Sequence, residues 1–158
     1  MYREEHLEIA RDVLARHGVE YMFIGKGAAI MQGFPDTTQD IDIYPRKDVE
    51  NNRRLVCALR EMGFEINAKT EAEIGSGKDF IQLRGEPFDL DIVFAPDGFD
   101  SFDEAQLFTI VSDGFPMMSI EGIIRTKRAA GRERDRASLP QLADFKRYLD
   151  ERGRGKKA

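Results

Sequence analysis

Residues 19–44 read VEYMFIGKGAAIMQGFPDTTQDIDIY and combine two predicted strands with a glycine turn and a short helix between them. The branched and aromatic opening run predicts a buried strand over 19–24, which ends at Gly25. The small apolar residues that follow predict a helix over 27–32 after a tight turn. A turn that leads from a strand into a helix points backbone N–H groups at one spot, where they suit a phosphate, and Lys26 adds a positive charge there.

Three acidic residues stand in apolar strand contexts. Acid and apolar residues alternate from Asp40 to Tyr44, so an extended chain places Asp40 and Asp42 on one face. Asp91 recurs between apolar neighbours in a later predicted strand, and we favour it over Asp89 as the third acid for that reason. Carboxylates that converge repel one another unless a hard cation compensates them, and oxygen ligands suit Mg²⁺ or Mn²⁺. The pattern therefore predicts a metal site of the kind used in phosphoryl and nucleotidyl transfer.

Helices and strands alternate along the rest of the chain. Cap residues and apolar periodicity predict helices over 4–17, 49–62, 101–104, 119–130 and 136–151, and strands over 64–66, 79–84, 88–94 and 107–111. Pro140 is expected in the first turn of the last helix, because proline is tolerated there. This order predicts an α/β (α+β) fold: a mixed β-sheet core with a helical C-terminal cap. We expect a single domain over 1–151 and a basic tail over 152–158.

Composition excludes several classes of protein. A chain of 158 residues, of which 41% are hydrophobic, fits one compact domain that buries its own core. Its single cysteine, Cys57, excludes an intramolecular disulfide framework and a thiolate-rich zinc site, and its position predicts a buried core residue. No stretch approaches the ~20 consecutive apolar residues that cross a bilayer. We therefore expect a cytoplasmic protein without a membrane partner.

Charge divides the chain into two unequal parts. Residues 1–124 carry 12 Lys and Arg against 24 Asp and Glu, whereas residues 125–158 carry 12 against 5. The net charges are −12 and +7, which add to the total of −5. A basic C-terminal segment attracts the acidic part of the chain, and it also suits phosphate groups of a polyanionic partner.

The motifs combine into a pattern that resembles the minimal nucleotidyltransferase superfamily, with its polymerase-beta-like fold. The resemblance rests on Ile24-Gly25-Lys26-Gly27, then Thr38-Gln39-Asp40-Ile41-Asp42-Ile43, and on Asp91 at the place of the third acid. Within residues 119–135, the run KRAAGRERD at 127–135 is similar to a signature of the branch that includes abortive-infection and toxin-type nucleotidyltransferases. In one respect the chain departs from the family pattern, because Lys26 replaces a small residue of the glycine turn.

The resemblance implies a role for each residue that matches the family pattern. Asp40 and Asp42 would bind the metal, and Asp91 would share it and activate the acceptor hydroxyl. The phosphates of the nucleotide would be held by a set of glycine-turn, hydroxyl and basic residues: Gly25, Lys26, Thr38, Lys127 and Arg134. Lys26 has an alternative role, in which its ammonium replaces part of the cation's charge beside the first two acids.

These roles together predict a metal-dependent, NTP-dependent nucleotidyltransferase that moves a nucleoside monophosphate to an acceptor hydroxyl and releases pyrophosphate. Mg²⁺ or Mn²⁺ would be the cofactor and a nucleoside triphosphate such as ATP the substrate. RNA, a protein side chain or a small molecule are the acceptor classes, and an antitoxin partner would fit a role in toxin–antitoxin or phage defence. The alternative is a catalytically silent nucleotide-binding or RNA-binding module of the same fold.

Overall fold

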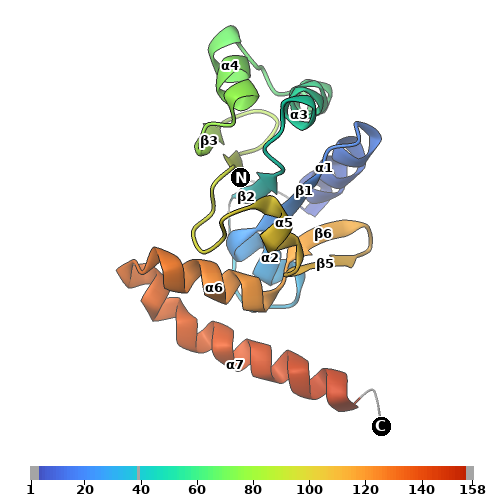
Figure 1. Ribbon diagram of the computed structural model, residues 1–158. Helices are drawn as coiled ribbons and strands as arrows, with labels where there is room; N and C mark the ends of the chain where they lie inside the picture. The colour runs from blue at the N-terminus through green and yellow to red at the C-terminus, as the bar shows by residue number, and fades with distance from the viewer. Residues whose placement is uncertain (1–3, 39, 156–158) are drawn as a thin grey trace.

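The computed structural model describes residues 4–38 and 40–155, which form a mixed sheet flanked by helices (Figure 1). The helices are α1 (Glu4–Arg16), α2 (Gly25–Met31), α3 (Val49–Met62), α4 (Ala68–Ser76), α5 (Phe102–Gln106), α6 (Ile120–Ala130) and α7 (Glu133–Gly155). The strands are β1 (Tyr21–Ile24), β2 (Ile41–Pro45), β3 (Phe80–Leu83), β4 (Leu90–Val93), β5 (Thr109–Ser112) and β6 (Phe115–Met118).

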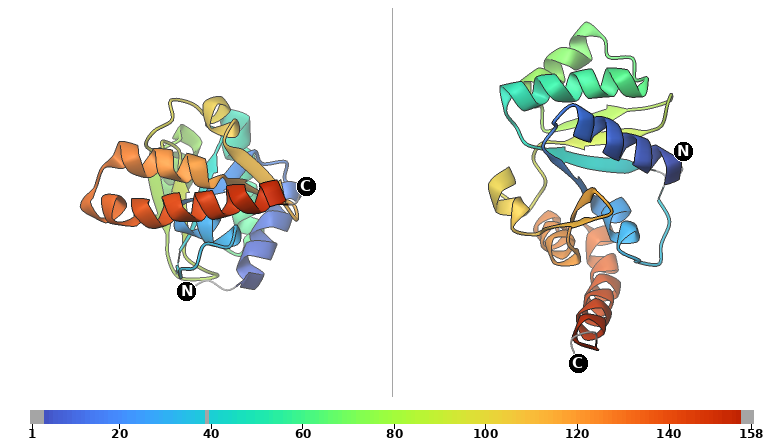
Figure 2. Two further views of the ribbon diagram at one scale, coloured as in Figure 1. Left: turned by 90° about the horizontal axis from the view of Figure 1, so that it is seen from below. Right: turned by 90° about the vertical axis from the view of Figure 1, so that its right-hand side faces the viewer.

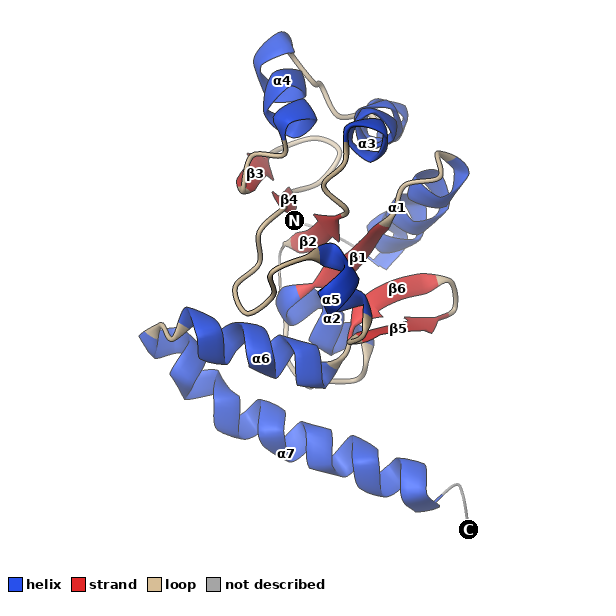
Figure 3. Ribbon diagram, in the orientation of Figure 1, coloured by secondary structure: helices blue, strands red, loops and turns tan. Residues whose placement is uncertain are grey.

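The described strands form one six-stranded sheet in the order β3-β4-β2-β1-β6-β5. Strand β2 pairs parallel with β4, β1 pairs parallel with β6, and the β1–β2, β3–β4 and β5–β6 pairs are antiparallel. Figure 3 shows these strands at the centre of the molecule with helices on either side. The predicted α/β fold with a mixed sheet and a helical C-terminal cap is confirmed.

Helices cover both faces of the sheet. Helices α1, α3 and α4 lie on one side of the strands, whereas α2, α5, α6 and α7 lie on the other (Figure 2, right). The central strands are buried between these layers: Met22 in β1, Ile43 in β2 and Ile92 in β4 are fully buried. Burial of such side chains stabilises the fold by roughly 1.5–3 kcal/mol each, so the central strands anchor the acids that they carry.

Local cap residues determine where most of the helices begin and end. The Asp48 carboxylate accepts hydrogen bonds from two backbone N–H groups at the start of α3, and Gly63 ends that helix in the left-handed region. Ser101 and Ser119 cap α5 and α6 in the same way. Helix α2 differs, because Ile24 precedes it and its side chain offers no cap. The first N–H groups of α2 therefore have no side-chain acceptor from the cap position.

One prediction between α3 and β6 is wrong, and two elements of this region are missing from the prediction. Residues 64–66 form no strand, and they pack as a loop that leads into α4, a helix capped by Asn67 that the prediction omits. Strand β6 is also absent from the prediction, although Asp113-Gly114 between two apolar runs is typical of a β-hairpin. In both places tertiary contacts select one of two locally acceptable conformations.

The C-terminal region also differs from prediction. Helix α7 begins at Glu133 and includes Pro140 in its interior. Asp135 accepts a hydrogen bond from the Arg132 N–H just before the helix, so a cap starts α7 earlier than expected. The helix continues to Gly155, and residues 152–155 of the expected tail are therefore helical. Cys57 is exposed, against the prediction of a core position.

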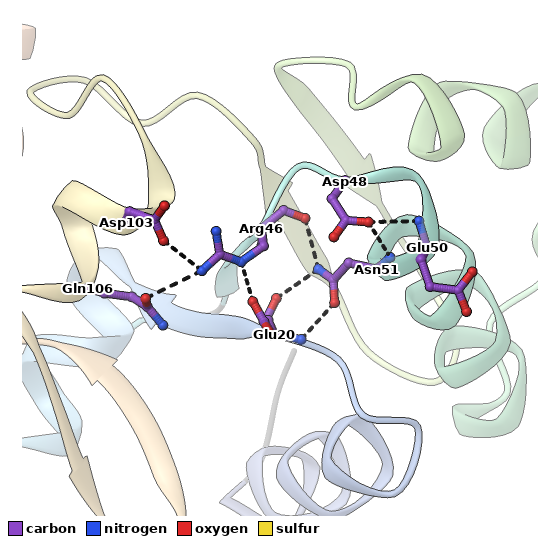
Figure 4. A network of polar contacts seen from close by, with 7 residues as sticks. All are labelled: Glu20, Arg46, Asp48, Glu50, Asn51, Asp103 and Gln106. Carbon is purple, nitrogen blue, oxygen red and sulfur yellow. Dashed lines mark hydrogen bonds and ion pairs between the residues drawn. The ribbon is translucent and has the colours of Figure 1, made fainter.

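A polar network ties the neighbouring ends of strands β1 and β2 to α3 and α5 (Figure 4). Asn51 is 3% exposed, and its amide donates to the backbone oxygens of Glu20 and Arg46 and accepts from the Glu20 N–H. The Arg46 guanidinium contacts the carboxylates of Glu20 and Asp103. The network holds the start of β1 against the end of β2, and this structural role accounts for its polar residues.

Within the part of the chain that the structure describes, no helix is long and apolar enough to cross a membrane.

Candidate active site

Asp42 and Asp91 lie side by side at the centre of the sheet. The parallel register of β2 and β4 places Asp42 opposite Asp91 and Ile43 opposite Ile92. Because side chains alternate along a strand, the two acids point to one face while the flanking isoleucines and leucine point to the other. Asp91 is only 7% exposed, and Asp42 is half-buried. Two predicted site residues therefore meet in space, although 48 positions separate them in the sequence.

Gly25 forms the wall of this site next to Asp42. Its φ angle of +69° lies in the left-handed region, and a Cβ added there would come within 2.5 Å of Asp42 Oδ2. Any other residue would collide with the carboxylate as well as strain the backbone. The glycine turn at the end of β1 therefore lies directly against the Asp42 carboxylate.

The acidic pair has unusual protonation chemistry. Burial raises the pKa of Asp42 from 3.8 to about 7, and three further effects act in the same direction: its hydrogen bond with Asp91 and the negative charges of Asp91 and Asp40. Only the positive charge of Arg84, among the causes that act on Asp42, lowers its pKa. Near neutral pH the pair therefore takes up or releases a proton easily, which suits a site where protons are transferred.

Arg84 contacts the other acid of the pair. Its Nη1 lies 2.8 Å from Asp91 Oδ1, and the contact is an ion pair without the alignment of a hydrogen bond. Among the described residues, this buried oxygen has no hydrogen-bond partner. The sequence prediction omits Arg84. The register of the β3–β4 hairpin would have indicated it, because Gln82 pairs with Asp91 and alternation places Arg84 on the same face.

Asp40 and Asp89 lie beside the pair in different roles. The backbone N–H of Asp40 donates to Thr38 Oγ1, so these two predicted residues contact each other just before β2. Asp89 accepts a hydrogen bond from the Gly85 N–H in the β3–β4 turn, and this bond is the main reason that its pKa is lowered. Within residues 4–38 and 40–155, no three acidic, His or Cys side chains gather as a ready metal site. The expected group of three acids is therefore a close pair with Asp40 next to it.

The predicted basic residues lie in two places. Lys26 is exposed on the glycine turn, and its Nζ lies 3.2 Å from Asp36 Oδ2. The Nζ of Lys127 lies 3.4 Å from Oδ1 of the buried Asp135 carboxylate, where α6 meets α7. Burial alone would raise the pKa of Asp135, but the hydrogen bond from Arg132 and the charge of Lys127 lower it overall. The last predicted residue, Arg134, is exposed on the first turn of α7.

Two hollows lie near these elements. One has a volume of about 10 Å³ behind α2, with Asp40 and Asp42 in its lining, which is space for about one water molecule. The other is an open groove of about 450 Å³ between α6 and α7, lined by Phe108 and by basic residues that include Arg128 and Lys146. A nucleotide does not fit the first hollow.

Comparison with known proteins supports the fold. No protein-family model matches the chain, and no curated protein matches it in sequence. Its structure is similar to that of the lincosamide antibiotic adenylyltransferase LnuA with bound lincomycin, with a TM-score of 0.61 at 17% identity over 89% of this chain and 96% of that one. It is also similar to a candidate nucleotidyltransferase from Thermotoga maritima, with a TM-score of 0.52 at 18% identity over 96% of both chains. At these identities the likeness shows the fold, and the chain therefore has the fold of nucleotidyltransferases.

Proposed function

We propose that this chain is a nucleotidyltransferase that moves a nucleoside monophosphate from a nucleoside triphosphate to an acceptor hydroxyl. The observation that carries the proposal is the pair of carboxylates, Asp42 and Asp91, held against the glycine turn at Gly25. The nucleotidyltransferase fold of the chain supports it. A fold alone does not establish an activity, but here it coincides with a site of suitable chemistry.

The residues of the pair fit a divalent cation. The charge of Asp91 raises the pKa of Asp42, the guanidinium of Arg84 contacts only the Asp91 side of the pair, and one buried oxygen of Asp91 has no hydrogen-bond partner among the described residues. Mg²⁺ is commonly held by one or two carboxylates together with substrate phosphates. Asp42 and Asp91 would hold it, with Asp40 as the third expected ligand. When bound, the cation would neutralise charge on the phosphates and so stabilise the transition state.

The glycine turn and Lys26 would position the triphosphate. The Ile24 side chain does not cap the first N–H groups of α2, and these groups would donate to phosphate oxygens. Lys26 pairs with Asp36 on the surface, and such exposed pairs contribute only about 0–1 kcal/mol. Breaking this ion pair therefore costs little free energy, so the Lys26 ammonium can turn to a phosphate. This pairing favours the phosphate role of Lys26 over the role of a substitute cation, while Thr38, Lys127 and Arg134 stay proposed phosphate contacts.

The reaction requires a group that accepts the proton of the attacking hydroxyl. The acceptor oxygen forms a bond to the α-phosphorus as the bond to the bridging oxygen of the β-phosphate breaks, and pyrophosphate leaves. The hydroxyl proton passes to a carboxylate of the acidic pair. Asp91, the third acid, would orient the hydroxyl and accept this proton, while Asp42 holds the cation.

A transfer assay tests the proposal. Nucleoside triphosphates labelled at the α-phosphate are incubated with the protein, Mg²⁺ or Mn²⁺, and one acceptor class at a time: total RNA, total protein, or small hydroxyl compounds that include a lincosamide. Label should move to one class in a metal-dependent way, and the Asp42→Asn variant should lose this transfer. The Asp144→Asn variant, which removes an exposed acid of α7, is the matched control and should keep it.

The same assay separates the alternatives. Transfer to RNA or to protein would place the chain with toxin-type or phage-defence enzymes, and an antitoxin partner would then be sought by copurification. Transfer to a small molecule would indicate chemistry of the kind named for LnuA. Binding of a triphosphate without transfer to any acceptor would refute the enzyme and favour the silent nucleotide-binding module.

A further inference from the structure

Arg84 follows β3 directly and brings a guanidinium onto the acidic pair from the neighbouring strand. Its Nη1 lies 2.8 Å from Asp91 Oδ1. The two partners are unequally buried, because the Arg84 side chain is 42% exposed and the Asp91 side chain is 10% exposed. Asp91 lies within the central strand β4, whereas the guanidinium of Arg84 borders solvent. Of the two, Arg84 is therefore the partner that can leave the contact.

The charges around Arg84 are of one sign. Asp91, Asp40 and Asp89 all act on it with negative charge, and Arg84 in turn acts on Asp42. A single guanidinium thus compensates the acids that the proposed function assigns to metal binding. Opposite charges at this distance attract strongly where water is partly excluded, so Arg84 offsets part of the repulsion between the acids.

We propose that Arg84 is an internal counter-cation that occupies Asp91 when no metal is bound and competes with a divalent cation for this carboxylate. A metal ion held by Asp42 and Asp91 would be repelled by a guanidinium 2.8 Å from Asp91 Oδ1, so Arg84 turns toward solvent as the ion binds. The inference rests on the proposed function for the identity of the ligands.

Metal binding without nucleotide gives the direct test. The Arg84→Gln variant keeps a polar side chain and removes the charge. MnCl₂ is titrated into each protein by calorimetry, and free Mn²⁺ is measured in parallel by electron paramagnetic resonance. We expect the variant to bind Mn²⁺ at least about tenfold more tightly than the natural chain, which corresponds to about 1.4 kcal/mol. Equal or weaker binding by the variant would overturn the inference.

Two further variants separate the charge from other effects. Arg147→Gln removes an exposed arginine that pairs with Asp144 on α7, so it changes the net charge equally but leaves the acidic pair alone. It should bind Mn²⁺ like the natural chain. Arg84→Lys keeps the competing charge, and its affinity should also stay near that of the natural chain. If either variant gained as much Mn²⁺ affinity as Arg84→Gln, competition by a positive charge at Asp91 would not be the cause of the tighter binding.

Thermal unfolding provides an independent readout. With a chelator present, the Arg84→Gln variant should unfold at a lower temperature than the natural chain, because the acids lose their counter-cation. Saturating Mn²⁺ should raise the unfolding temperature of this variant more than that of the natural chain. An Arg84→Gln variant that is equally stable with a chelator would contradict the role of Arg84 as a compensating charge.

These measurements fail separately from the proposed function. If Arg84→Gln binds Mn²⁺ more tightly but no protein transfers a nucleotide, the counter-cation role of Arg84 stands and the proposed enzyme activity is refuted. If the natural chain transfers a nucleotide but Arg84→Gln binds Mn²⁺ as the natural chain does, the enzyme activity stands and the counter-cation role is refuted.

Discussion

Replacing Asp42 by asparagine should stabilise the metal-free protein at alkaline pH and leave it nearly unchanged at acid pH. Burial and the neighbouring acids raise the pKa of Asp42 from 3.8 to about 7 in the folded state. Between these values the folded protein binds a proton that the unfolded chain has released, so stability falls as pH rises through this window. Asparagine cannot ionise, and its amide can still donate a hydrogen bond to Asp91. The Asp42→Asn variant therefore does not lose this stability as the pH rises.

The size of the effect follows from the pKa shift. A shift of about 3 pH units corresponds to about 4 kcal/mol at 1.36 kcal/mol per unit, and this is an upper limit because the protein relaxes around a buried charge. The part of this window that lies above pH 5 spans about 2 pH units, which corresponds to about 3 kcal/mol in a measurement from pH 5 to pH 8. For a chain of this length, that is roughly 6–12 °C in Tm.

Chemical unfolding with a chelator at several pH values between 5 and 8 measures this difference. All groups outside the acidic pair titrate in both proteins, so the variant minus the natural chain isolates the titration of the pair. The Asp144→Asn variant, at an exposed position on α7, should show no such pH dependence. A constant difference across the range, or an Asp42→Asn variant that is less stable at pH 8, would refute the reasoning. Added Mg²⁺ should stabilise the natural chain at pH 8 and not the variant.

Three further substitutions test separate parts of the structure. Asn51→Ala should lower the free energy of unfolding, measured in urea, by about 2–4 kcal/mol, because buried backbone groups, among them those of Glu20, lose their hydrogen-bond partner. A loss below about 1 kcal/mol would contradict this role. Gly25→Ala should cost more stability than Gly63→Ala, by about 1 kcal/mol or more in the same assay, since both have positive φ but only the first meets a carboxylate. Lys26→Ala should weaken triphosphate binding in calorimetry by about tenfold at low salt and less at high salt, with stability changed by under about 1 kcal/mol; a salt-independent loss would argue against a charge contact.

Sequence reasoning succeeded where short-range physics decides the structure. Helices α3, α5 and α6 begin within one residue of their predicted starts, where Asp48, Ser101 and Ser119 cap them, because a cap side chain needs only the N–H groups two or three residues away. The strands predicted over 79–84 and 88–94 are likewise present as β3 and β4, which a short turn joins. These elements lie where the local pattern and the fold agree.

It failed where distant contacts choose between conformations. The run 64–66 has the composition of a strand, but it forms the loop into α4, and the described sheet ends at β3 without it. Pro140 lies inside α7 because packing of α6 against α7 stabilises a longer helix than the proline pattern favours. Strand β6 enters the sheet beside β1, a pairing between residues about 94 positions apart.

The amino-acid sequence by itself determined the chemistry of the candidate site: an alternating acidic strand, a later acid between apolar residues, and a glycine turn before a helix. Alternation and turn geometry are properties of a few neighbouring residues, so they can be inferred without a fold. Only the tertiary structure decided which groups meet. The parallel pairing of β2 with β4 brings Asp42 to Asp91 and leaves Asp40 beside them, and the β3–β4 register adds Arg84. Burial and mutual repulsion, which shift the pKa of Asp42 and create the need for a counter-cation, exist only once those strands are packed together.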